Sequence, residues 1–309
     1  MSLMRKALLA ASTNAWLRNR ATKAAFVRRA TKAFMPGERL EDALGAAKAQ
    51  QALGVNTILT RLGENITRAE EAEEVTQHYL EVLDKVAAAG LDAQISIKPT
   101  QLGLDQDPAL CRRNIDRILE RTEQRNNFLW IDMEYSRYVD PTLDLYRYAR
   151  ARSPRIGIAI QSYLYRTEKD IESLIPLGSA VRMVKGAYLE PPEIAFPKKA
   201  DTDENFYRMC VRLLQPDAVA AGCLLHVGTH DMTLVHRLET YIREHNVPAS
   251  AYEFAMLYGI QPTAQRRMAK EGKRIRVLIS YGEYWFPWYM RRLAERPANV
   301  WFVLKNIGG

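Results

Sequence analysis

The sequence predicts an α/β protein whose main domain is a (βα)8 barrel of the TIM type, preceded by extra N-terminal helices. Three observations support this prediction. The chain has 309 residues, of which 47% are hydrophobic and 26% charged, so it can bury the core of one large domain. After residue 41, short β-branched runs alternate eight times with longer amphipathic stretches. No linker or low-complexity tract interrupts the alternation, which favours eight parallel strands that close into a barrel.

Each predicted strand is a short run rich in β-branched and aliphatic residues. The strands are expected at Val55–Thr60, Ala93–Lys98, Phe128–Met133, Ile156–Gln161, Ala180–Lys185, Gly222–Val227, Ala251–Met256 and Arg274–Ser280. Two helices carry start signals: Thr67–Ala89 opens with the capping-box pair Thr67 and Glu70, and Asp107–Arg125 opens with Asp-Pro. The other helices are expected at Pro141–Arg152, Glu168–Leu174, Asp203–Ala221, Met232–His245, Thr263–Gly272 and Phe286–Arg296.

Residues 1–37 differ in charge from the rest of the chain. They contain eight basic side chains and no acidic one, so the net charge of +8, which is 44 − 36, resides in this segment. Its apolar residues, among them Trp16, Phe26 and Phe34, predict one or two amphipathic helices that end at Pro36. We therefore assign residues 1–40 to basic N-terminal helices and residues 41–309 to the barrel.

Three roles fit this basic segment: a cap packed on the barrel, a surface that contacts an anionic membrane, or an organelle-targeting peptide. A secretory signal is not predicted, because the apolar stretch from Ala7 to Leu17 is short and more arginines follow it. The remaining residues have no net charge, so nucleic-acid binding by the barrel is not predicted.

Several other classes of protein are excluded. No apolar run approaches the roughly 20 residues that cross a bilayer. Three scattered cysteines predict neither a disulfide framework nor a CxxC metal site, and they fit a reducing compartment. We therefore expect a cytoplasmic protein, peripheral on the inner face of the membrane if the basic segment binds lipid. The dinucleotide-binding, P-loop, zincin and hydrolase-elbow motifs do not occur.

The main functional signal is a set of polar residues at the strand ends. They are Lys98, Asp132, Glu134, Gln161, Arg182, Lys185, His226 and His230. In a parallel barrel these ends meet on one face, where catalytic sites of this architecture lie. The lysines and arginines predict an anionic ligand. Gly186 and Ala187 allow the backbone to approach a flat or phosphorylated group closely. The histidines and carboxylates lack a recognised ligand spacing, so no metal is predicted.

A second signal follows the last strand. If the chain from Phe286 onward is helical, Trp288, Arg291, Arg292 and Glu295 share one face. This face is either a salt-bridged surface or a lid that clamps a small carboxylate against a flat partner. A barrel aldolase that uses Lys98 or Lys185 as a Schiff-base lysine is a further alternative.

These segments resemble the motifs of proline dehydrogenases. WYMRRLAE resembles the YxxRRxxE signature of that family. The family's successive strand-end motifs are resembled, in order, by ISIKPTQLG, WIDMEYSRYVDPTLDL, IAIQSYLYRT, VRMVKGAYLEP, VGTHD and YEFAMLYGI. The resemblance covers nearly the whole chain after residue 50 and is strongest to the short monofunctional bacterial type.

The resemblance implies a distorted (βα)8 barrel that binds FAD and oxidises L-proline to Δ1-pyrroline-5-carboxylate by hydride transfer to flavin N5, with electrons passed to a membrane quinone. It implies catalytic roles for Asp132 and Arg182. The implied substrate-binding residues are Lys98, Arg291, Arg292, Leu257, Leu278 and Trp288. The implied FAD-binding residues are Met133, Gln161, Lys185, Gly186, Ala187, Thr229, His230 and Glu295. Glu64 is implied as a gate that pairs with Arg291.

Three positions depart from the family pattern. Trp288 and Leu278 stand where tyrosines of the substrate pocket are usual, and Thr60 stands where Asp is usual. These changes make a related substrate, such as hydroxyproline or another secondary amino acid, an alternative to proline. A non-catalytic scaffold at a membrane surface is the alternative from a different class.

Overall fold

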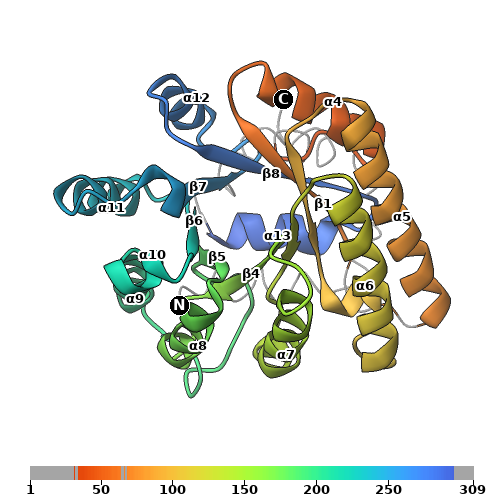
Figure 1. The fold of residues 1–309 in the computed structure, drawn as a ribbon, viewed down its shortest axis with the longest axis horizontal. Helices are drawn as coiled ribbons and strands as arrows, with labels where there is room; N and C mark the ends of the chain where they lie inside the picture. The colour runs from red at the N-terminus through yellow and green to blue at the C-terminus, as the bar shows by residue number, and fades with distance from the viewer. Residues whose placement is uncertain (1–30, 32–33, 64–65, 67, 296–309) are drawn as a thin grey trace, which may run out of the picture.

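The structure is a computed structural model that describes residues 31, 34–63, 66 and 68–295, with side chains described as far as Met290. Eight parallel strands form a closed barrel in chain order, which confirms the predicted fold (Figure 1). The strands are β1 Asn56–Arg61, β2 Ala93–Ile97, β3 Leu129–Ile131, β4 Ile156–Gln161, β5 Ala180–Val184, β6 Leu224–Gly228, β7 Tyr252–Leu257 and β8 Ile275–Tyr281. Each overlaps the run predicted for it.

The helices lie mainly outside the barrel. They are α4 Leu40–Gln51, α5 Ala69–Ala88, α6 Pro108–Gln124, α7 Val139–Arg150, α8 Thr167–Leu174, α9 Lys199–Leu213, α10 Pro216–Ala220, α11 Met232–Glu244, α12 Pro262–Lys270 and α13 Trp285–Glu295. Short 3-10 helices are η1 Pro99–Leu102, η2 Ser136–Tyr138, η3 Ile175–Leu177 and η4 Ala249–Ala251. The basic N-terminal helices predicted over residues 1–40 fall almost wholly outside the described residues.

Local sequence explains where some of the helices begin, such as α6. Asp107 caps α6 as predicted, and its carboxylate accepts hydrogen bonds from the backbone N–H groups of Ala109 (2.8 Å) and Leu110 (3.1 Å). The start of α5 differs from the prediction, because Arg68 rather than Thr67 occupies its N-cap and no side chain caps it. Packing of its buried face, which includes Tyr79 and Leu83, therefore stabilises α5 more than capping does.

The single helix predicted over Asp203–Ala221 is wrong. The structure has two helices there, α9 and α10, because Pro216 divides the predicted helix. Proline disfavours the helical conformation at the residue before it, and Gln215 accordingly has an extended backbone with φ −69° and ψ 154°. Pro216 then begins α10, where its missing N–H has no consequence.

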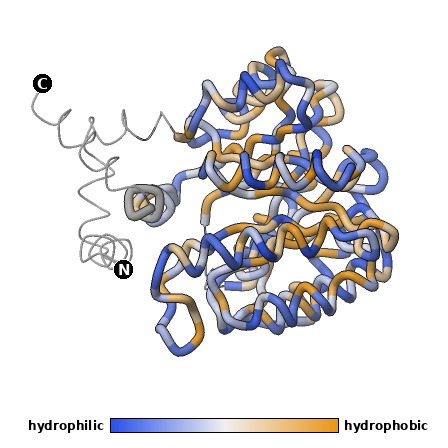
Figure 2. Tube along the Cα trace, turned by 90° about the vertical axis from the view of Figure 1, so that its left-hand side faces the viewer, coloured by the Kyte–Doolittle hydropathy of each residue, from blue (hydrophilic) through white to orange (hydrophobic). Residues whose placement is uncertain are grey.

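The barrel is distorted at its eighth helix. In a regular barrel the helix after β8 would join the outer ring, but α13 lies across one end of the barrel (Figures 1 and 2). The vacant outer position is filled by α4, which packs against β1 and β8 and stands between α12 and α5. The sequence pattern did not predict α4. An apolar cluster of Met35, Leu62, Trp285, Phe286, Trp288 and Tyr289 fixes α13 in place.

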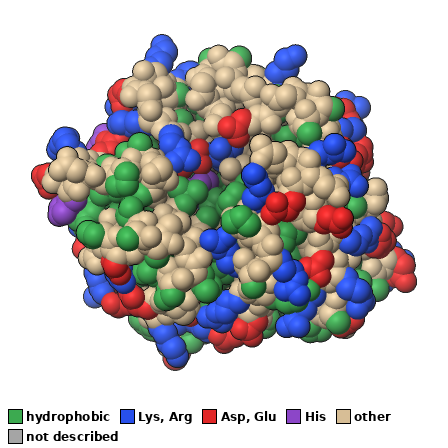
Figure 3. Space-filling model, viewed as in Figure 1, with side chains coloured by type: hydrophobic (Ala, Val, Ile, Leu, Met, Phe, Trp, Pro, Cys, Tyr) green, Lys and Arg blue, Asp and Glu red, His purple; other side chains and the backbone are tan. Residues whose placement is uncertain are grey.

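The outer surface carries charge of both signs. Figure 3 shows Lys and Arg side chains interspersed with Asp and Glu over the face in view. Neighbouring helices are joined by ion pairs such as Arg117–Glu73 between α6 and α5 and Arg212–Glu172 between α9 and α8, each 2.6 Å. Exposed pairs of this kind contribute at most about 1 kcal/mol each. None of the described helices is long and apolar enough to cross a membrane, and the three cysteines are buried and free.

Below the strand ends, one large ring fills the centre of the barrel. Trp130 of β3 is fully buried, and its neighbour on β4 is Gly157. A Cβ atom at position 157 would lie 2.5 Å from Cζ3 of the indole, so only glycine leaves room for this ring.

We predict that Gly157→Ala lowers the free energy of unfolding by about 1–3 kcal/mol, because the added methyl group forces the indole to move in a closed core. Urea unfolding followed by fluorescence would measure the change. Gly45→Ala in the exposed part of α4 is the matched control, since nothing lies within 4 Å of its new methyl group. The control should raise stability by about 1 kcal/mol, and equal losses for both variants would contradict the packing role.

Candidate functional site

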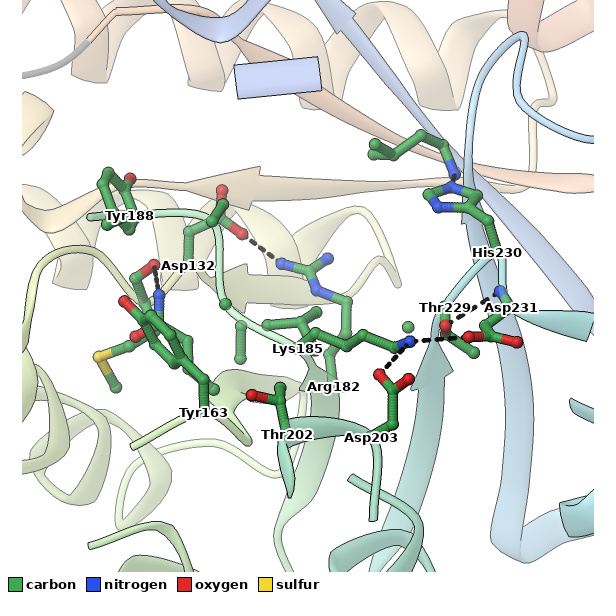
Figure 4. Close-up of a pocket in the computed structure, with 18 of the residues that line it drawn as sticks. Asp132, Tyr163, Arg182, Lys185, Tyr188, Thr202, Asp203, Thr229, His230 and Asp231 are labelled. Carbon is green, nitrogen blue, oxygen red and sulfur yellow. Dashed lines mark hydrogen bonds and ion pairs between the residues drawn. The ribbon is translucent and has the colours of Figure 1, made fainter. Parts of the chain in front are cut away.

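A cavity of about 1240 Å³ opens at the carboxyl ends of the strands, and its lining includes residues from each of the eight strands or from the positions directly after it. Leu62 from the loop after β1 and Trp288 from α13 complete it on one side, and the long loop between β5 and α9 lines the other. Figure 4 shows side chains from β3, β5, β6 and α9 pointing toward this space. This is the face on which the sequence predicted the functional residues to meet.

Asp132 holds the polar centre of the cavity together. Its Oδ1 accepts hydrogen bonds from Ser96 Oγ (2.8 Å) and from Nη2 of Arg182, and its Oδ2 accepts one from Lys98 Nζ (3.2 Å). The same Nη2 lies 3.0 Å from Ser96 Oγ. The side chains of Lys98 and Arg182 are 9% and 7% exposed, so both cations lie largely out of water. One carboxylate against two cations leaves a net positive charge that suits an anionic ligand.

The charges in this group set its protonation. Burial by itself would raise the pKa of Asp132, but the charges of Lys98 and Arg182 and the hydrogen bonds from Ser96 and Lys98 bring it below its ordinary value of 3.8. Burial lowers the pKa of Arg182, and Asp132 opposes that effect. Asp132 is therefore ionised at neutral pH and is a weak base. Its geometry suits it to hold two cations rather than to accept a proton.

Lys185 lies at the edge of the cavity in a second group of charges. Its Nζ is 2.5 Å from Asp203 Oδ1 and 3.0 Å from Asp231 Oδ2 (Figure 4). Lys199 pairs with the same two carboxylates. Asp231 also caps α11 by accepting a hydrogen bond from Thr233 N (3.2 Å). The four charges join both ends of the loop over residues 186–198 to the starts of α9 and α11, so this wall of the cavity is firmly anchored.

Gly186 allows the chain to turn at the end of β5. Its φ of +114° is strained for any residue with a side chain, and a Cβ atom there would lie 2.3 Å from the ring of Tyr163. Farther along the loop, the rings of Tyr188 and Tyr135 pack with centroids 4.3 Å apart. The backbone at Gly186 and Ala187 thus borders the cavity without a bulky side chain in between.

Gln161 and Arg182 each have a buried polar atom with no hydrogen-bond partner among the described residues, and both side chains line the cavity. Gln161 donates weakly through Nε2 to the carbonyl of Met133 (3.4 Å), while its Oε1 has no partner. Nη1 of Arg182 has none either. Buried polar groups are normally satisfied, so these atoms indicate a site that a ligand completes.

Thr229 and His230 follow β6 at the same edge. The backbone N–H of Leu257 donates to His230 Nε2 (2.8 Å), so the neutral ring carries its proton on Nδ1. Thr229 Oγ1 accepts from Asp231 N (3.2 Å), which leaves its hydroxyl proton for another acceptor. Both side chains border the cavity.

An apolar wall faces the charged centre. Leu257 of β7 and Leu278 of β8 are register partners, and with Trp288 they line the cavity. The tyrosine expected from the family pattern at 278 would place a hydroxyl near this wall. Leucine supplies only hydrocarbon, so this side of the cavity is the less polar one.

The described residues that the family resemblance implies for the site are brought together in this one cavity. Glu134 and His226, grouped with them at the strand ends, are buried outside its lining, and Glu134 accepts hydrogen bonds from N and Oγ1 of Thr100. The lining of the cavity includes Lys98, Asp132, Met133, Gln161, Arg182, Lys185, Gly186, Ala187, Thr229, His230, Leu257, Leu278 and Trp288. The remaining predicted residues lie outside what the structure describes: Glu64 as a whole, and the side chains of Arg291, Arg292 and Glu295, which belong to α13.

Sequence reasoning missed several members of the site. Ser96 could have been found, because it precedes Lys98 by two residues and must face the same side of β2. Asp231 follows His230 directly. Asp203 and Tyr163 gave no local signal, since their positions depend on how α9 and the segment after β4 pack against the barrel.

The family model and the curated relatives that match this chain all have the same description. The sequence model of the family described as Proline dehydrogenase matches residues 43–305. Proline dehydrogenase 1 of Bacillus subtilis subsp. natto is 39% identical over 237 residues, which is 77% of each chain. Proline dehydrogenase of Deinococcus radiodurans is 36% identical over 239 residues, which is 76% of each chain.

Solved structures share the fold. Proline utilization A from Bdellovibrio bacteriovorus, inactivated by N-propargylglycine, superimposes with a TM-score of 0.79 at 22% identity. The alignment covers 87% of this chain but only 32% of that larger protein. At this identity the likeness concerns the architecture of the barrel.

We predict that Asp132→Asn lowers the free energy of unfolding at pH 7 by about 3 kcal/mol, because it removes the carboxylate that both buried cations contact. The folded-state pKa of Asp132 lies below its unfolded value of 3.8. Its stabilising contribution is therefore fully present above pH 3.8 and is lost as the pH falls through the lower folded-state pKa. Denaturant unfolding of both proteins from pH 7 downward would measure the difference.

Asp84→Asn is the matched control, because Asp84 pairs with Arg121 and Arg125 on the exposed surface. It should change stability by at most about 1 kcal/mol. A loss for Asp132→Asn no larger than that of the control would contradict the central role of Asp132.

Proposed function

This chain belongs to the proline dehydrogenase family, and from that premise we propose that its cavity binds FAD and L-proline together and catalyses oxidation of the amino acid to Δ1-pyrroline-5-carboxylate. The observation that carries the proposal is the cluster of Lys98, Asp132 and Arg182 at the centre of a cavity lined by the other described residues that the family resemblance implies for the site. Members of the family are FAD-dependent oxidoreductases.

The cavity fits the cofactor. It is large enough for an extended ligand, its backbone is bare at Gly186, and the unsatisfied Gln161 Oε1 and Arg182 Nη1 offer an acceptor and a donor to a polar ring. FAD would be held by Met133, Gln161, Lys185, Gly186, Ala187, Thr229 and His230, with Glu295 supporting from α13. When bound, the flavin supplies the acceptor, at N5, for the hydride that leaves the substrate carbon next to nitrogen.

The substrate would bind between α13 and the charged centre. Lys98, Arg291 and Arg292 would hold its carboxylate, and Leu257, Leu278 and Trp288 would contact its ring. Such a clamp fixes the reacting carbon in one orientation, which is a large part of catalysis for two bound reactants. Glu64 would pair with Arg291 to close the entrance.

Asp132 and Arg182 have different tasks in this scheme. Asp132 holds Lys98 and Arg182 by direct hydrogen bonds. Arg182 directs a positive charge into the cavity, where negative charge would develop on the reduced cofactor. The substrate amine must be neutral when hydride leaves, and the positive centre favours its deprotonation.

A related substrate is supported by one specific observation. Leu257 and Leu278 are register partners that form an apolar wall, with Trp288 beside them. A wall without the usual tyrosine hydroxyl would accept a bulkier secondary amino acid or hydroxyproline, so the same site can serve a close analogue of proline.

Anaerobic addition of L-proline to the purified FAD-loaded protein should bleach the flavin absorbance, because hydride passes to the cofactor.

Arg292→Ala should weaken proline binding far more than FAD binding, since the Arg292 guanidinium is assigned to the substrate carboxylate. Flavin absorbance titrations measure both dissociation constants. A protein that stays colourless with FAD would exclude this function, and equal weakening of both ligands would contradict the clamp.

We propose a quinone as the electron acceptor, reached at a membrane surface through the basic residues 1–37. Deleting residues 1–35 should reduce binding to vesicles that contain anionic lipids while turnover with a soluble dye acceptor persists. Co-sedimentation with vesicles measures the binding. Undiminished co-sedimentation of the shortened chain would rule out this role for the segment.

A further inference from the structure

Polar groups continue below the cavity into the interior of the barrel. Arg276 of β8 donates from Nε to Glu253 Oε2 of β7 (3.1 Å) and from Nη1 to Asp92 (2.8 Å) and the carbonyl of Thr57 (3.0 Å). Glu253 Oε2 lies 2.9 Å from His226 Nε2 of β6. The side chains of Arg276, Glu253 and His226 are 6%, 3% and 0% exposed, so this chain of groups is sealed from water.

Trp130 connects this buried group to the cavity. Its indole packs against the ring of His226 with centroids 4.3 Å apart. The guanidinium carbon of Arg182 lies 5.2 Å from the centroid of the same indole, within the range of a cation–π contact. Gln94 Oε1 accepts from Trp130 Nε1 (2.7 Å) and fixes the other edge of the ring. The indole is therefore held on one side by His226 and supports Arg182 on another.

Burial keeps His226 neutral. Burial lowers the pKa of His226, and the nearby Glu253 does not reverse this effect. Burial alone would raise the pKa of Glu253, but contacts with His226 and Arg276 lower it to about 2, so the carboxylate is ionised and balanced by Arg276. The imidazole Nε2 lies 2.9 Å from Glu253 Oε2, and neither ring nitrogen makes a hydrogen bond among the described residues, so packing and charge hold the ring in place.

The neutral state of His226 matters because Arg182 lies next to it on the neighbouring strand. Arg182 and His226 are register partners on β5 and β6, so their side chains leave the sheet on the same face. A cationic imidazole would repel the guanidinium of Arg182 and compete with it for the indole. A neutral one packs against the indole and leaves it to Arg182.

We propose that His226, which lies against Glu253, is a positioning residue that fixes the indole of Trp130 beneath Arg182 and thereby orients the Arg182 guanidinium toward the bound cofactor. Together, Trp130, Asp132 and Ser96 fix the guanidinium so that Nη1 remains for the ligand. This inference rests on the proposed function, because that function places the cofactor above Arg182.

The test compares His226→Leu, which removes the aromatic ring, with His226→Phe, which keeps an uncharged ring. In full-length protein loaded with FAD, His226→Leu should slow flavin reduction by saturating L-proline on the order of 10- to 100-fold, because the cation above it loses its orientation. Dissociation constants for FAD and L-proline should change less than twofold. The reduction potential of the bound flavin should fall, and His226→Phe should restore most of the rate and the potential.

Val227→Ala controls for lost stability alone, since Val227 is the next residue of β6 and points away from the barrel interior. It should lower the melting temperature without changing the rate of flavin reduction or the flavin potential. If His226→Leu does not fold, Trp130→Phe serves in its place. This variant replaces the indole beneath Arg182 with a smaller ring and removes the hydrogen bond from Trp130 Nε1 to Gln94 Oε1.

The outcomes separate the two proposals. A wild-type rate and potential in His226→Leu, or in Trp130→Phe when that replaces it, would overturn the positioning role while leaving the proposed function intact. Parallel losses in the Leu and Phe variants would also overturn it, since the ring would then not matter. Wild-type protein whose flavin is not reduced by L-proline would overturn the proposed function and this inference with it.

Discussion

The site depends on one largely buried carboxylate between two buried cations. Asp132, directly after β3, binds Lys98, directly after β2, and Arg182 on β5, and Ser96 joins the same group. Burial of these charges would be strongly unfavourable without their mutual contacts, so none of them can move independently. The cluster is possible only because closure of the barrel brings strands that are far apart in sequence to a common axis. Nη1 of Arg182 has no hydrogen-bond partner among the described residues, and this side chain lines the ligand space.

The second structural feature is the exchange of positions between two helices. With α13 across the mouth of the barrel, the outer groove between β8 and β1 would expose apolar strand residues, and α4 covers it instead. The same exchange brings Trp288 into the cavity wall and places the helix that contains the twin arginines above the strand ends. The distortion of the barrel is therefore what gives the site its lid.

A third feature is the polar group inside the barrel, below the cavity. Barrels of this type usually fill their interior with branched aliphatic side chains. Here Trp130 and the group of His226, Glu253 and Arg276 occupy it, and Gly157 leaves the room that the indole needs. Such a core needs complete pairing to be stable, and the hydrogen bonds to Asp92, Thr57 and Gln94 supply part of it. Rigidity below the cavity then fixes the orientation of the side chains that face the ligand.

The sequence alone determined the eight strands, most of the helices and the charged residues at the strand ends, because hydrophobic periodicity and capping are local properties. Because parallel strands of a barrel end on one face, the sequence alone groups Lys98, Asp132 and Arg182. The tertiary structure decided which strand-end residues pair, where α4 and α13 lie, and that Lys185 meets Asp203 from a helix start. It also decided that His226, first grouped with the strand-end ligands, lies below the cavity against Trp130 and Glu253. These outcomes depend on register and helix packing across the closed barrel, which join residues up to hundreds of positions apart and leave no periodic trace along the chain.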